Sequence, residues 1–323
     1  MTRIFAHANY DFIGFRRKAI LATITLFVIG MIALAVRGIN YSIEFTGGTL
    51  VHFAADNPVN LDQLRSALSA AGIDGPEITP FSGLNEYDIR ARVGVKASDA
   101  NNTSIAKSAI DSALTHVVGA GHFHYASVYA VGPKVGSELQ SKAFWAIFLS
   151  FFAVLIYLAY RFEWRFGVAA VIATFHDIVL TICFIAVMRI EVSLVVVAAV
   201  LSMVGYSLND TIVIFDRVRE NLRKNRRDQL VNVLNRSVNE TLPRSVLTHC
   251  TVLVTLVALI VFAGPVIRPF AEVMFFGVLT GTFSSVFIAA PALLIIERKW
   301  PGVDGRGVKP ANRTAPVRGR QPA

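Results

Sequence analysis

The segment VGYSLNDTIVIFDRVREN, residues 204–221, begins inside a long apolar run and ends in a dense group of charged residues. Asp210 lies before the apolar run has finished. A carboxylate placed in hydrocarbon without a partner costs at least about 2.5–3.5 kcal/mol on insertion scales. The segment therefore raises two questions: whether this run crosses a membrane, and what task a carboxylate performs there.

The composition favours a membrane protein. Of the 323 residues, 54% are hydrophobic and only 16% are charged, whereas soluble domains carry about 25% charged residues. The net charge of +9 alone is also typical of proteins that bind nucleic acid. The two cysteines, Cys183 and Cys250, both lie in apolar runs, so the sequence does not indicate a disulfide framework.

Six segments approach the roughly 20 apolar residues that a transmembrane helix needs. We predict transmembrane helices at residues 19–36, 143–160, 166–188, 192–215, 245–263 and 270–296. The remaining segments are an N-terminus (1–18), a loop domain (37–142), a loop (216–244) and a basic tail (297–323). The predicted fold class is an α-helical polytopic membrane protein. We expect the first helix to be an uncleaved anchor because its apolar core is longer than that of a signal peptide.

The basic residues are concentrated in every second segment between the predicted helices, and these segments lie on one side of the membrane. This is the positive-inside pattern. The N-terminus, the turn at 161–165, the loop 216–244 and the tail hold most of the 31 Lys and Arg residues. The two short loops on the other side hold one each, Arg189 and Arg268. We therefore predict that both termini are cytoplasmic, and we attribute the net charge to topology and contact with membrane lipid instead of nucleic acid.

The loop domain alternates strand and helix patterns in the order β-α-β-β-α-β, which is typical of a small ferredoxin-like α+β domain. The domain contains no pattern for a catalytic nucleophile or a phosphate loop. His116, His122 and His124 lie close together but lack a convincing third-ligand pattern for a metal. We predict a binding module with no metal, no cofactor and no enzymatic activity.

Acidic residues also lie away from the ends of two predicted helices. Asp177 follows His176 near the middle of the third, and Asp210 lies toward the cytoplasmic end of the fourth. Arg244, at the cytoplasmic start of the fifth helix, is at a depth compatible with Asp210. Burial and a nearby cation act on a carboxyl group in opposite directions, so a carboxyl between them can carry protons near neutral pH. The alternative is that Asp210 pairs with a partner subunit and that Arg244 only anchors the helix.

Four motifs carry a family resemblance. They are YSIEFTGGTLV (41–51), FHDIVLT (175–181), GYSLNDTIVIFDRVREN (205–221) and NETLPRSVLTHCTVL (239–253). With the six predicted helices and the loop domain after the first, the chain resembles the six-helix members of the SecD/SecF family of bacterial protein-export subunits. One departure is Glu44, where the family usually has Asp; the charge is retained.

The resemblance implies a multi-pass protein of the bacterial inner membrane whose loop domain is periplasmic. It implies association with SecD, with the SecYEG channel and, in many bacteria, with YajC, and the use of the proton gradient to promote late export of unfolded secretory polypeptides. Asp210 and Arg244 match family positions that are functionally required, and Asn209 is expected to polarise the proton path. Secondary polar positions are Asp177, for which a structural role is also open, and His176. The family motif after the first helix comprises Glu44, Phe45, Thr46, Gly47 and Gly48.

Two other functions remain open on sequence alone. A small-molecule or lipid exporter of the same architecture is one, although such exporters usually have twelve spans. The other is a scaffold that steadies a translocation channel without using protons.

Overall fold

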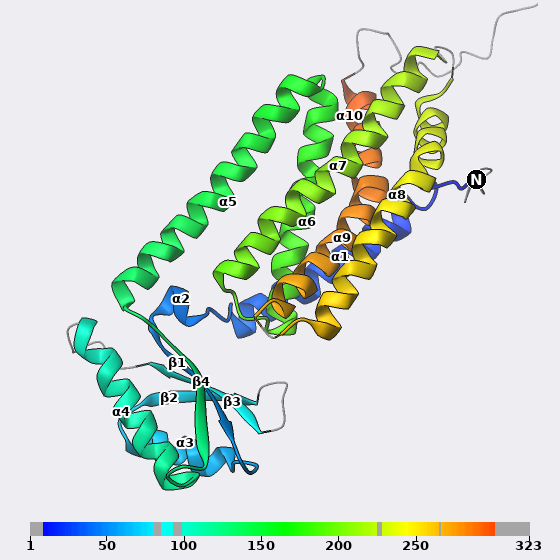
Figure 1. The fold of residues 1–323 in the computed structure, drawn as a ribbon. Helices are drawn as coiled ribbons and strands as arrows, with labels where there is room; N and C mark the ends of the chain where they lie inside the picture. The colour runs from blue at the N-terminus through cyan, green and yellow to red at the C-terminus, as the bar shows by residue number, and fades with distance from the viewer. Residues whose placement is uncertain (1–8, 81–84, 93–98, 225–227, 265, 301–323) are drawn as a thin grey trace, which may run out of the picture.

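A computed structural model describes residues 9–80, 85–92, 99–224, 228–264 and 266–300 (Figure 1). The residues outside this description are the N-terminal segment before residue 9, residues 81–84 and 93–98 of the loop domain, residues 225–227 of the basic loop, residue 265 and the tail after Trp300.

Six helical segments in the described part of the chain are long and apolar enough to cross a membrane. They are α1 (Arg16–Arg37), α5 (Pro133–Arg161), α6 (Trp164–Met188), α7 (Leu194–Lys224), α8 (Leu230–Phe262) and the sixth segment, which comprises α9 (Arg268–Ser284), η1 (Ser285–Ala289) and α10 (Ala290–Lys299). This confirms the predicted helical membrane architecture. Helices α7 and α8 continue past their apolar parts because ion pairs such as Arg217–Glu240 join their polar ends.

The sixth segment changes from α-helix to π-helix at Ser285–Ala289, and Pro291 follows in the first turn of α10. Proline has no backbone N–H, and its ring clashes with the carbonyl group four residues earlier in a regular helix. A π-helical turn relieves both problems by widening the helix locally. The segment therefore remains helical past its proline.

The domain between α1 and α5 is a four-stranded antiparallel sheet with α3 (Leu61–Ala70) and α4 (Asp99–Val117). Its strands β1 (Gly48–Ala55), β2 (Asp74–Pro80), β3 (Glu86–Arg92) and β4 (Phe123–Val131) lie in the order β2-β3-β1-β4. The predicted ferredoxin-like domain is thereby confirmed. Alternate residues of β1, such as Val51 and Phe53, are fully buried against Leu64, Leu68 and Ile110 of the two helices.

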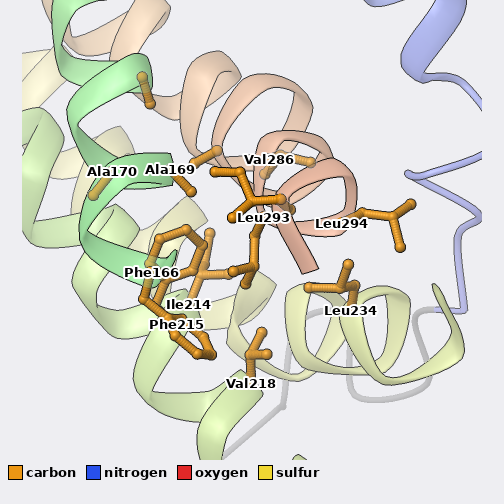
Figure 2. Packing of buried hydrophobic residues seen from close by; sticks show 14 of the residues in the cluster. Phe166, Ala169, Ala170, Ile214, Phe215, Val218, Leu234, Val286, Leu293 and Leu294 are labelled. Carbon is orange, nitrogen blue, oxygen red and sulfur yellow. The ribbon is translucent and has the colours of Figure 1, made fainter. Parts of the chain in front are cut away.

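The bundle has its largest apolar core at the end remote from the sheet domain. Figure 2 shows Phe166 of α6, Phe215 of α7, Leu234 of α8 and Leu293 of α10 packed together there. The rings of Phe166 and Phe215 meet edge to face at 5.4 Å. Toward the sheet domain, a second core around Met203 and Val278 continues between α7 and α9.

Helices α7 and α9 approach closely because glycines lie between them. A Cβ atom on Gly277 would lie 2.1 Å from Cγ of Met203, and one on Gly281 would lie 2.8 Å from Cβ of Ser207. The GxxxG pattern at 277–281 is thus a helix-packing motif. In contrast, helices α1, α5 and α8 expose many large apolar side chains, as expected for helices that face lipid or another subunit.

We predict that Gly277→Val lowers the free energy of unfolding by about 1–3 kcal/mol, because the added methyl groups overpack a filled contact with Met203. The measurement is denaturant unfolding of the isolated chain in detergent micelles. Gly205→Val is the matched control, since nothing lies within 4 Å of a Cβ built on Gly205. Equal effects of the two variants would contradict the close α7–α9 contact.

Candidate functional site

Asp210 is buried in the middle of the bundle, and its closest polar partner comes from α8. The hydroxyl of Ser245 donates a hydrogen bond of 2.5 Å to Oδ1 of Asp210. The other carboxylate oxygen, Oδ2, is buried and has no hydrogen-bond partner in the described part of the chain. A buried polar atom without a partner is costly, so Oδ2 is the position where a proton or a further donor would be most strongly held.

His249 and Tyr206 complete this site, and the sequence analysis did not single out either residue. His249 is buried one turn after Ser245, and its Nδ1 donates to the Ser245 carbonyl oxygen. The ring of Tyr206 packs edge to face on His249 at 5.4 Å, while its hydroxyl donates to the Thr248 carbonyl oxygen. Ser245 and His249 have the i, i+4 spacing that places two residues on one helix face, a pattern visible in the sequence.

The structure places the other two predicted relay residues at the periphery of this site. Arg244 is exposed and makes no ion pair or hydrogen bond with Asp210 among the described residues. Asn209 is also exposed. It continues a line of small exposed residues on α7 that includes Ser202 and Gly205.

Asp177 forms a second buried carboxylate site between three helices. Its Oδ2 accepts hydrogen bonds from Ser207 of α7 at 2.5 Å and from Ser284 of α9 at 2.7 Å. Its Oδ1 lies 2.9 Å from Nδ1 of His176. With both oxygens occupied by hydrogen-bonding groups, Asp177 is held as a cross-link between α6, α7 and α9. Nε2 of His176 is buried without a partner among the described residues.

One turn of α7 forms hydrogen bonds with three neighbouring helical segments. Ser207 contacts Asp177 on α6, Asp210 contacts Ser245 on α8, and Thr211 shares a hydrogen bond of 2.8 Å with Ser285 of the π-helical turn. A displacement of this turn would therefore change its hydrogen bonds with α6, α8 and the sixth helical segment together.

The motif of residues 44–48 joins the sheet domain to the bundle. Residues Ile43–Thr46 form the short helix α2, in which Phe45 is buried. Gly47 and Gly48 have φ angles of +74° and +137°, a backbone conformation that other residues adopt only with strain. A Cβ on Gly48 would also lie 2.9 Å from the carbonyl oxygen of Ala91. Both glycines are therefore required for the chain to turn from α2 into β1.

The sheet domain is also fastened to the start of α7. Oε2 of Glu44 accepts a hydrogen bond of 2.6 Å from the backbone N–H of Leu194, the first residue of α7. Arg90 of β3 forms an ion pair with Glu191, which lies in the turn before α7. Burial raises the pKa of Glu191, and the guanidinium of Arg90 opposes that shift. The helix that carries Asp210 thus begins at a contact with the sheet domain.

Two family descriptions match the chain. Residues 109–299 match "Protein export membrane protein SecD/SecF, C-terminal". Residues 32–59 match "SecD/SecF GG Motif", and this range contains α2 and both glycines of the turn into β1.

Several known proteins are similar over most of the chain. The protein translocase subunit SecF of Gemmatimonas aurantiaca is 50% identical over 308 residues, which are 94% of this chain and 92% of that protein. The corresponding subunit of Rickettsia typhi is 36% identical over 293 residues, covering 90% and 93% of the two chains. The resemblance inferred from the motifs is therefore confirmed.

A solved structure shares the fold. The crystal structure of SecDF from Thermus thermophilus, described as a translocon-associated membrane protein, superposes with a TM-score of 0.78 at 32% identity over 90% of this chain. The chain spans 39% of the length of that longer protein. From the family matches and these relatives, the chain belongs to the SecD/SecF family of protein export membrane proteins.

Proposed function

We propose that this protein is a non-enzymatic subunit of the bacterial Sec translocase that works with SecD and uses the proton gradient to promote late export of polypeptides. In this proposal both termini are cytoplasmic and the sheet domain is periplasmic, where it meets the emerging chain. SecYEG and YajC are the further proposed partners. The names and the solved structure of the relatives support the translocase role.

The observation that carries the proton-coupled part is the environment of Asp210. Its carboxylate is buried and holds one hydroxyl donor, Ser245, on Oδ1, while Oδ2 is without a partner in the described residues. A proton arriving at Oδ2 would neutralise the carboxylate without displacing Ser245. Arg244, which directly precedes Ser245 on α8, is the proposed cation of the relay.

The site is proposed to be completed by SecD. The exposed line Ser202, Gly205 and Asn209 lies on the same helix as Asp210, and small residues allow the backbones of two membrane helices to approach closely. Asn209 would then act at the interface, where its amide can orient a polar group of the partner.

Coupling to the outside is proposed to run along α7. Protonation would change the balance of polar contacts at Asp210 and thereby bias α7 between two positions. The start of α7 is held to the sheet domain through Glu44 and through the Arg90–Glu191 ion pair. A shift of α7 would be transmitted to the domain that meets the exported chain.

We expect Asp210→Asn to abolish the gradient-dependent part of export, because an amide cannot take and release a proton at neutral pH. Its remaining oxygen can still accept the Ser245 hydrogen bond, so folding and SecD binding should persist. Export into inverted vesicles is measured with and without a protonophore. Asp216→Asn, the same change at an ion-paired position on α7, is the control and should retain the gradient response. A normal gradient response of Asp210→Asn would contradict the proton-carrier role of Asp210.

Gly205→Val is expected to weaken association with SecD at least tenfold, about 1.4 kcal/mol, because the added side chain separates the two helices. Co-purification of tagged SecD through a detergent dilution series measures this change. Val261→Ala, which alters an exposed apolar position on α8, should leave association unchanged. Undiminished binding of the Gly205 variant would place the SecD surface elsewhere.

The contact between Arg90 and Glu191 is expected to show energetic coupling. Arg90→Ala, Glu191→Ala and the double variant should deviate from additivity by about 0.5–3 kcal/mol in the free energy of unfolding, since each single change removes the same ion pair. A parallel cycle on the exposed pair Arg65–Asp62 should give a value near zero. Strict additivity at Arg90 and Glu191 would mean that the ion pair does not fasten the domain.

A further inference from the structure

A cavity of about 550 Å³ lies between α5, α6 and α7 near the sheet-domain end of the bundle. Its walls are mainly apolar and include Ile147 of α5, Ile178 and Ile182 of α6, and Val196 and Val200 of α7. An apolar cavity of this kind is not filled by water, because water finds no polar partners there. The three helices are predicted to cross the membrane, so the cavity lies at the depth of lipid hydrocarbon.

Packed side chains border the cavity along the helix axes. Toward the sheet domain, Phe45 of α2 packs with Ala143 of α5 and Val197 of α7, and all three line the cavity. Toward the other end, Val154 and Leu158 of α5 pack against the bundle cores. A transmembrane helix with its side chains is about 10 Å wide, whereas a hydrocarbon chain is narrower and flexible.

The face of α5 that borders the cavity changes from polar to apolar along its length. Lys134, Ser137 and Ser141 follow one another at i, i+3 and i+7 on this face, and Phe144 and Ile147 continue it. Ser137, Ser141, Phe144 and Ile147 all line the cavity. The cation and the hydroxyl groups lie at the membrane boundary, and the apolar side chains lie deeper in the membrane. This order matches a phospholipid, whose polar headgroup is followed by acyl chains.

We propose that this cavity is a phospholipid site of the leaflet next to the sheet domain. One acyl chain lies between α5, α6 and α7, and the phosphate lies beside Ser137 and Ser141, with Lys134 near it. The site is distinct from the buried carboxylates, and Phe45, which lines it, belongs to the motif that turns into the sheet domain.

The test uses the full chain co-purified with SecD in bilayer discs of phosphatidylethanolamine and phosphatidylglycerol. The probe is phosphatidylethanolamine with a diazirine near the end of one acyl chain. After illumination, mass spectrometry locates the lipid adducts. We expect adducts to concentrate on the peptides that contain Ile147 and Ile178–Ile182. Ile147→Trp and Ile182→Trp, which fill the cavity from two different helices, should reduce this labelling about tenfold.

Matched controls are Ile156→Trp on α5 and Ile172→Trp on α6, which change the same residue type at positions 58% and 43% exposed. They should leave labelling of the cavity unchanged. Uniform labelling over all exposed helix faces, or cavity labelling that persists in both filling variants, would overturn the proposal.

A second probe tests whether a protein occupies the cavity. It does not require the Ile147→Trp and Ile182→Trp variants to fold. Benzoylphenylalanine replaces Phe144, which lines the cavity. Adducts with lipid support the proposal. An adduct with SecD or with a second copy of this chain overturns it, because a polypeptide would then cover the site.

Discussion

A carboxylate can stay buried in a membrane-embedded bundle only if groups of neighbouring helices reach it, and this constraint organises the structure. Hydrocarbon offers no hydrogen bonds, so every polar group must find its partner within the protein. Asp177 is reached by serines of α7 and α9, and Asp210 is reached by a serine of α8. These short bonds require closely packed helices, and the α7–α9 approach depends on Gly277 and Gly281.

The two buried carboxylates are satisfied to different extents. Asp177 has both oxygens engaged and ties three helices together, which is the arrangement of a structural cross-link. Asp210 has one engaged oxygen and one without a partner in the described residues. This asymmetry supports the proposal that Asp210 is the proton-exchanging residue, whereas Asp177 stabilises the packing of three helices.

The connection between bundle and sheet domain rests on main-chain geometry as much as on charge. Two glycines with positive φ let the chain turn from α2 into β1, and Glu44 accepts a hydrogen bond from the first residue of α7. The Glu44 side chain is long enough to reach this backbone donor across 150 positions of the sequence. The motif is therefore explained by joining two parts of the molecule and needs no catalytic role.

The sequence by itself determined the six apolar helices, the ferredoxin-like domain and the cost of Asp210, because hydropathy, strand alternation and the burial of charge are local properties of the chain. It also identified the family through four motifs. Only the tertiary structure decided which groups meet. Arg244 is exposed, and its neighbour Ser245 makes the contact with Asp210. His249 and Tyr206 join that site, and Arg90 pairs with Glu191 across 101 positions. Such contacts depend on helix rotation and on packing between distant segments, which periodicity within one helix does not specify.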